Sequence, residues 1–168
     1  MKKHFLTNLA LLIFLNLLIK PFWFFGNEVG VQNQVGEESY GFYFSLFNFA
    51  FILNMLLDVG INNYNNRAIA RNPTVLKEHL AAIIPLKLFL SIIYTGVVLV
   101  SGKILGYTQE QFQMLWILVL NQFLASFILY FRTNISGLQL FRTDSFLSVM
   151  DRSLMILFTG LLLWGNIS

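Results

Sequence analysis

Gly36–Ala70 reads GEESYGFYFSLFNFAFILNMLLDVGINNYNNRAIA. After an acidic turn it becomes a phenylalanine-rich apolar segment, which ends in Asp58, an asparagine cluster and Arg67. A charge in hydrocarbon costs at least ~2.5–3.5 kcal/mol on insertion scales, so a charged residue at membrane depth usually faces a cavity or a partner. We therefore expect the polar face of this stretch to have a function.

Composition places the stretch in a membrane protein. Of the 168 residues, 57% are hydrophobic and 11% are charged, whereas an ordinary soluble domain carries about 25% charged residues. A small soluble domain cannot hide so much apolar surface. The sequence predicts an all-α, polytopic integral membrane protein without disulfides or thiolate metal sites, since it contains no cysteine. Its basic residues are scattered, which argues against nucleic-acid binding.

Five segments are long and apolar enough to span a bilayer, which takes about 20 residues. They are residues 5–25, 40–70, 80–100, 112–136 and 145–164, within a single transmembrane domain covering 1–168. The second would be ~46 Å long as one helix, so it must tilt, break or project from the membrane. Gly60 is the candidate for flexing it. The first segment resembles a signal peptide, but it is too long and no small-x-small cleavage site follows.

The basic residues predict the orientation, because cytoplasmic loops are enriched in Lys and Arg. An N-terminus in the cytoplasm leaves Lys103 as the single basic residue on the far side. The residues then on the cytoplasmic side are Lys2, Lys3, Arg67, Arg71, Lys77, Arg142 and Arg152. We therefore expect a cytoplasmic N-terminus. Tyr130 is expected at the membrane interface.

Helical projection gathers the polar residues of the second segment. At 100° per residue, four of them fall within an arc of ~80°. They are Asn54, Asp58, Asn62 and Asn65. The alternative for Asn62–Asn66 is a frayed helix end at the wet interface. Asp58 and Arg67 lie on opposite sides of a straight helix, so they do not form a pair along it.

Three more cations lie within predicted spans. Lys20, Lys87 and Arg132 are each close enough to a helix end to reach the interface by snorkelling. The alternative is that they line a path for an anionic substrate. For Lys87, snorkelling to the cytoplasmic side is the favoured prediction.

Signs of an enzyme are lacking in the sequence. His4 and His79 give no metal pair at useful spacing, and no nucleophile triad or phosphate-binding glycine loop is found. We therefore predict no catalytic residues, no metal and no cofactor. Charges inside helices favour a transport path instead.

Six short motifs follow one another along the chain. They are Val35-Gly36, Tyr40-Gly41-Phe42-Tyr43, Asp58-Val59-Gly60, Arg67-Ala68-Ile69-Ala70, the turn Ser136-Gly137-Leu138-Gln139 with Arg142, and Ser148-Val149-Met150-Asp151-Arg152. In order and spacing they resemble the polysaccharide flippase branch of the multidrug/oligosaccharidyl-lipid/polysaccharide exporter superfamily, over nearly the whole chain.

The resemblance implies a carrier that moves undecaprenyl-diphosphate-linked oligosaccharide across the bacterial inner membrane for O-antigen, capsule or related glycan assembly. Other glycan-assembly membrane proteins are the implied partners. Family members have twelve to fourteen helices in two lobes around an often cationic cavity. With five predicted helices, this chain corresponds to an incomplete N-terminal lobe, and we expect either a truncated flippase or a chain that needs a partner.

The same resemblance suggests roles for the polar residues. Lys20, Arg67 and Arg132 are the candidates for lining a cavity that meets the lipid diphosphate. Asn54, Asp58 and Asn62 would couple a proton or cation to transport, or hold the helix geometry. Rival interpretations are a cation-coupled drug or lipid II exporter of the same fold, a membrane enzyme such as a polymerase, and a structural membrane subunit that transports nothing.

Overall fold

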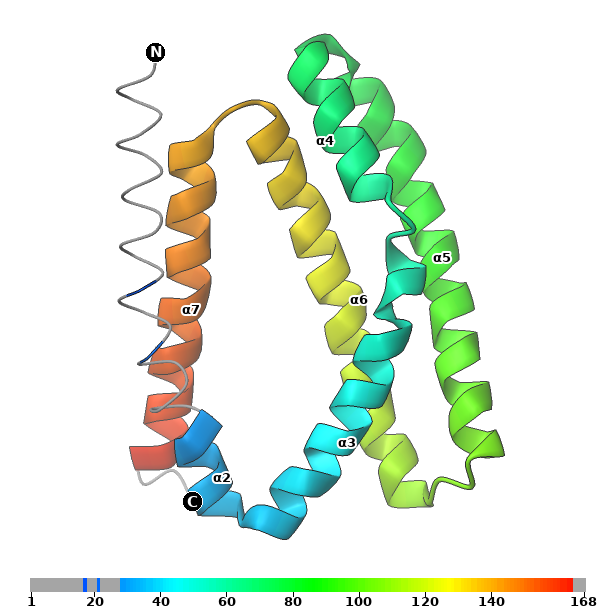
Figure 1. Cartoon of the computed structure of the whole chain (residues 1–168), viewed down its shortest axis with the longest axis vertical. Coiled ribbons are helices and arrows are strands. Elements are labelled where there is room, and N and C mark those ends of the chain that lie inside the picture. Colours follow the sequence, from blue (N-terminus) through cyan, green and yellow to red (C-terminus); the bar gives the residue numbers. More distant parts are fainter. Residues whose placement is uncertain (1–16, 18–20, 22–27, 165–168) are drawn as a thin grey trace. The chain divides into compact units, whose positions relative to one another are not determined.

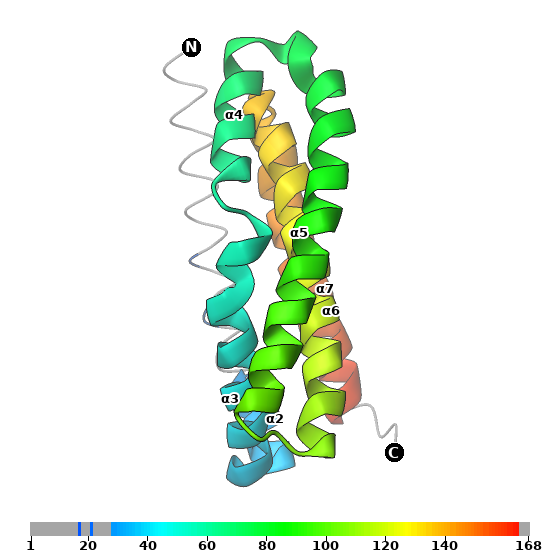
Figure 2. The same cartoon turned by 90° about the vertical axis from the view of Figure 1, so that its right-hand side faces the viewer.

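The computed structural model describes residues 17, 21 and 28–164, and its regular structure there is entirely helical (Figures 1 and 2). The all-α prediction is therefore confirmed for this part of the chain. Gly41–Gln139 forms one compact unit, and the described parts of 1–40 and 140–168 belong to a second.

The larger unit consists of one interrupted helix and a helical hairpin. Its elements are α3 (Glu37–Leu53, which begins just before the unit), the 3-10 helix η2 (Asn54–Leu57), α4 (Ile61–Arg71), the 3-10 turn η3 (Pro73–Val75), α5 (Leu76–Ile104) and α6 (Gln109–Gly137). α6 packs against η2, α4 and α5, and α5 also contacts η2. The interrupted helix therefore lies along both members of the hairpin.

Three segments in the described residues are long and apolar enough to cross a membrane: Glu37–Leu57, Pro73–Ile104 and Gln109–Gly137. The count of five spans is not confirmed. Most of 5–25 lies outside the described residues, and α7 (Phe141–Trp164) is not among the three.

Of the three alternatives predicted for the segment 40–70, the structure shows a break in the middle of the helix. α3 tightens into η2, and a turn at Asp58–Gly60 follows before α4 begins. Val59 and Gly60 have φ angles of +44° and +84°. Glycine adopts such a conformation without steric cost, whereas a β-branched residue there is strained. The break therefore falls at Gly60, where flexing was predicted.

α5 and α6 are each 29 residues long, several residues longer than their predicted spans. The start of α6 was predicted too late because it is set by a capping box rather than by hydrophobicity. The Thr108 hydroxyl accepts a hydrogen bond from the backbone N–H of Gln111, and the backbone N–H of Thr108 donates to Gln111 Oε1 at 2.7 Å. Polar capping thus begins the helix three residues before its apolar part.

The core joins the interrupted helix to the hairpin. Its buried members are Leu46, Ala50, Leu57, Tyr94, Val98, Leu115, Leu118 and Val119. The Tyr94 hydroxyl donates to the Ala50 carbonyl oxygen at 3.0 Å. Tyr130 is also fully buried, so its predicted interfacial position is wrong; α6 turns it toward the other helices.

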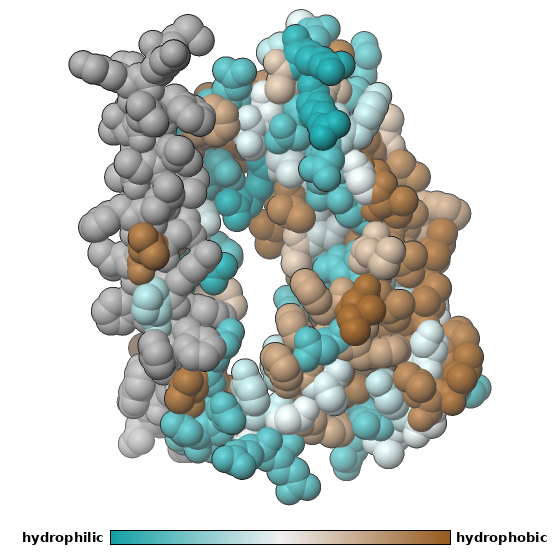
Figure 3. Space-filling view, in the orientation of Figure 1, coloured by the Kyte–Doolittle hydropathy of each residue, from teal (hydrophilic) through white to brown (hydrophobic). Residues whose placement is uncertain are grey.

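The outer surface of the hairpin is strongly hydrophobic. Figure 3 shows hydrophobic residues along the α5 side of this unit, and Ile92 in the middle of α5 is 71% exposed. Exposed apolar area of this extent is typical of a lipid-facing surface rather than a water-facing one. In the second unit, α2 (Val29–Val35) packs against α7, and Gly36, at φ +85°, links α2 to α3.

Candidate functional site at a broken helix

Lys87 caps the C-terminal end of η2, which is the end of the first half of the broken helix. It lies on α5, is 1% exposed, and its Nζ donates to the Leu57 carbonyl oxygen at 3.0 Å and to Ser126 Oγ at 2.7 Å. Leu57 is the last residue of η2, so its carbonyl is one of those that a helix end leaves without an intrahelical donor. The prediction that Lys87 snorkels to the interface is therefore wrong. α5 directs it inward, onto the break.

Two aromatic rings also face this ammonium group. Lys87 Nζ lies 5.9 Å from the ring centre of Phe127 and 5.8 Å from that of Tyr130. At this range an aromatic face attracts a cation, more strongly where water is excluded. The ammonium is thus surrounded by oxygens and π-faces supplied by η2 and α6.

Asp58 caps the start of the second half-helix. Its Oδ1 accepts from the backbone N–H of Asn62 at 2.9 Å, one of the N–H groups that the first turn of α4 leaves without an intrahelical partner. A cation at the C-terminal end of one half and an anion at the N-terminal end of the next both complement the helix dipoles. Asp58 and Lys87 also attract each other electrostatically.

The break lies beside the middle of the two long apolar helices. Lys87 and Ser126 both fall in the central half of their 29-residue helices, each ~43 Å long against a hydrocarbon layer of ~30 Å. Non-helical backbone within a hydrocarbon layer is tolerated only when it is buried in protein or lines a water-filled cavity. Lys87 and Asp58 supply the hydrogen bonds that such a break requires.

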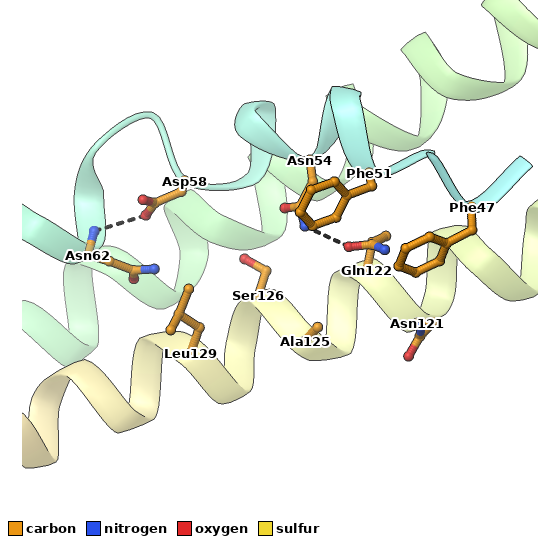
Figure 4. A pocket seen from close by; sticks show the side chains of 10 residues that line it. All are labelled: Phe47, Phe51, Asn54, Asp58, Asn62, Asn121, Gln122, Ala125, Ser126 and Leu129. Atoms are coloured by element: carbon orange, nitrogen blue, oxygen red, sulfur yellow. Dashed lines mark hydrogen bonds between the residues drawn. The ribbon is translucent and has the colours of Figure 1, made fainter. Parts of the chain in front are cut away.

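A cavity of about 280 Å³ lies beside the break, between the interrupted helix and α6 (Figure 4). It is lined by Phe47, Phe51, Asn54, Asp58, Asn62, Asn121, Gln122, Ala125, Ser126 and Leu129. Asn54 Nδ2 donates to Gln122 Oε1 at 2.6 Å. The side chain of Asn62 is 5% exposed, and neither its Oδ1 nor its Nδ2 has a hydrogen-bond partner among the described residues. A buried amide without partners is costly unless something else binds it.

Asn65 and Asn66 hold α4 against α6. Asn65 Nδ2 donates to Asn134 Oδ1, while Asn65 Oδ1 contacts Nδ1 of His79 at 2.9 Å. Asn66 Nδ2 donates to the Thr133 carbonyl oxygen at 3.1 Å. The alternative of a frayed, wet helix end is therefore wrong for Asn62 and Asn65, which are buried.

The structure brings together three of the six predicted site residues. Asn54, Asp58 and Asn62 line the same cavity, although the helix that was to align them is broken. Arg67 is exposed on α4, and Arg132 is half-buried on α6; neither lines this cavity. Lys20 lies outside the described residues.

Arg67 instead lines an open groove on α4. The groove has a volume of about 610 Å³ and is lined by Gly60, Asn63, Tyr64, Arg67, Ala68 and Arg71. Arg67 and Arg71 are one helical turn apart, so their guanidinium groups share one face of α4.

Sequence reasoning missed Gln122 and Ser126, which α6 supplies, and it favoured snorkelling over an inward direction for Lys87. A signal was present in α6, where buried positions recur every four residues: Leu118, Gln122, Ser126, Tyr130 and Asn134. Polar residues at helical spacing in an apolar span indicate a face turned toward protein. α5 carries a similar signal, because Lys87, Ser91 and Tyr94 follow helical spacing in an apolar span and are all buried.

Within residues 28–164, no group of three or more His, Cys, Asp or Glu side chains is placed to hold a metal ion. No protein-family model matches the chain, and neither the curated proteins nor the solved structures contain a significant match.

Proposed function

We propose that this chain forms part of the polar path of a membrane carrier, and that the path passes the broken helix. One observation carries the proposal: Lys87 is buried in the central half of a long apolar helix, and its ammonium bonds the terminal carbonyl of a half-helix. Discontinuous helices whose ends meet polar or charged groups near mid-membrane are typical of transporter binding sites. A helix that served only as an anchor would need neither the break nor the charge.

The cargo we propose is a polyprenyl-diphosphate-linked oligosaccharide, moved across the bacterial inner membrane with the N-terminus in the cytoplasm. The resemblance of the motifs around Asp58-Val59-Gly60 and Arg67 to polysaccharide flippases supports this cargo. The groove with Arg67 and Arg71 supports it as well, because guanidinium groups bind phosphate oxygens in bidentate fashion. The excess of basic residues on one side supports the orientation.

The test places Lys87→Met in the native gene, with Lys103→Met as the matched control. Both lysines are on α5, but Lys103 is exposed near its end. At equal protein level, we expect Lys87→Met to abolish surface glycan and to accumulate the lipid-linked precursor, while Lys103→Met exports normally. Normal export by both variants would overturn the proposal. Lost dye efflux with intact glycan would instead show a drug exporter.

Arg67 tests the contact with the diphosphate. Arg67→Ala removes a guanidinium group without affecting the core, since the residue is exposed. We expect glycan export to fall severalfold, and Arg67→Lys to recover only part of it, because lysine cannot bind phosphate in bidentate fashion. Unchanged export in Arg67→Ala would exclude Arg67 from the path.

A further inference from the structure

The cavity at the break combines an unpartnered amide with a carboxylate and aromatic rings. Asp58 and Asn62 lie at one end, the Asn54–Gln122 hydrogen bond lies in the middle, and Phe47 lies at the other end (Figure 4). The rings of Phe47 and Phe51 are stacked, with centroids 5.9 Å apart and planes inclined by 15°. These side chains offer hydrogen bonds of both kinds beside apolar ring faces.

The charges at the cavity disfavour an ion as its occupant. A metal cation would satisfy Asn62 Oδ1 but not Asn62 Nδ2, and no group of three or more His, Cys, Asp or Glu side chains in the described residues is placed to hold one. An anion would satisfy Nδ2 but would be repelled by the carboxylate of Asp58. Only a group that both donates and accepts hydrogen bonds satisfies both atoms of the amide, and a hydroxyl is such a group.

The volume of the cavity and its aromatic end limit which hydroxyl-bearing molecules can bind there. At about 280 Å³, the cavity falls just below the range of ~300–1,000 Å³ that is usual for small-molecule sites. It has room for one ring rather than for an extended chain of rings. Apolar ring faces next to hydroxyl-binding amides suit a molecule with a C–H face and an O–H rim, as a sugar ring has.

We propose that this cavity binds a single neutral, hydroxyl-rich ring, with Asn62 hydrogen-bonded to its hydroxyls and Phe47 and Phe51 against its face. The inference rests on the proposed carrier function, because the ring would be one sugar unit of the proposed cargo. The phosphate-binding role stays with the arginines of α4. Binding can be measured without transport, so the two proposals can fail separately.

The experiment uses the full chain in phosphatidylcholine nanodiscs and methyl-β-D-glucopyranoside as probe, with saturation-transfer NMR as readout. We expect transfer to the ring protons, and roughly tenfold weaker binding in Asn62→Leu, which loses the amide's hydrogen bonds. Asn48→Leu is the matched control, because Asn48 lies on α3, donates to the Phe44 carbonyl oxygen of the same helix and does not line the cavity.

A second pair of variants does not depend on a buried position. Phe51 is 55% exposed and lines the cavity, whereas Phe44 is 48% exposed on the same helix and does not. We expect Phe51→Leu to weaken binding about threefold through the lost ring contact, and Phe44→Leu to leave it unchanged.

Several outcomes would overturn the inference. A cavity that holds only water gives no transfer to the sugar in the wild-type chain. Transfer that persists equally in Asn62→Leu and Phe51→Leu places the sugar elsewhere. Line broadening of sodium or phosphate resonances that depends on Asn62 would make the cavity an ion site. None of these outcomes would alter the export phenotype of Lys87→Met, which tests the carrier function independently.

Discussion

Lys87 and Asp58 carry opposite charges and satisfy backbone groups at the two ends of a broken helix. The Lys87 ammonium satisfies the Leu57 carbonyl, and the Asp58 carboxylate accepts from the N–H of Asn62. Removing the lysine alone leaves the Leu57 carbonyl with only the long 3.5 Å hydrogen bond from Ser126 Oγ, and it removes the cation nearest to Asp58 that the electrostatics identify. A poorly satisfied buried group costs about 1–3 kcal/mol. The stability of the site therefore depends on keeping both charges or neither.

A double-mutant cycle tests this coupling. We expect Lys87→Met to lower the free energy of unfolding by about 1–3 kcal/mol, and Asp58→Asn to recover part of that loss in the Lys87→Met background. Asn can still accept from the Asn62 N–H, so only the charge is removed. The measurement is denaturant unfolding of the four chains in detergent micelles. Additive effects would contradict a direct interaction.

At the scale of elements, the interruption between η2 and α4 depends on the backbone conformation of Gly60. Gly60 has φ +84°, and an added Cβ would meet no atom within 4 Å. Glycine is therefore needed at this position for its positive φ and not because a side chain would clash. Gly96, on α5, also has open space around it but lacks the positive φ.

These two glycines predict opposite effects of the same substitution. Gly60→Ala should destabilise the chain by about 1–2 kcal/mol, because a Cβ is strained in the left-handed region. Gly96→Ala should stabilise it by up to about 1 kcal/mol, because alanine favours a helix. Thermal unfolding followed by circular dichroism measures both. Equal changes in the two variants would mean that the positive φ does not matter.

A third glycine controls how closely α4 approaches α6. An added Cβ at Gly137 would lie 3.1 Å from Ile69 Cβ and 3.2 Å from the Asn66 carbonyl oxygen. Small residues at such contacts let helices pack closely in membranes. Gly137→Val should push the helices apart and cost about 1–3 kcal/mol through overpacking. Gly96→Val, in open space on α5, is the control, and an equal loss there would refute the packing role.

At the scale of the whole molecule, the position of the basic residues predicts which ends of the helices face the cytoplasm. The chain has no cysteine, so single cysteines can be labelled without background. With a membrane-impermeant maleimide, Glu110→Cys should react in intact cells, and Lys77→Cys only after permeabilisation. Both residues are exposed and lie at opposite ends of the hairpin. The reverse pattern would invert the predicted orientation.

The sequence predicts which polar residues of the site lie together, but the structure brings them together in a different way. Asn54, Asp58 and Asn62 were grouped as one face of a continuous helix, and that helix is broken. They still share a cavity because α6 packs against both η2 and α4. The three residues remain together because α6 covers both halves of the broken helix.

The sequence by itself determined the helical character of the described chain and the presence of long apolar helices, because both follow from local composition and from the length of apolar runs. Only the tertiary structure decided the role of Lys87. The sequence allows a lysine in a span to reach the interface or to turn inward. It turns inward here because the broken helix presents a free carbonyl oxygen, and α6 a hydroxyl, within hydrogen-bond distance of its ammonium.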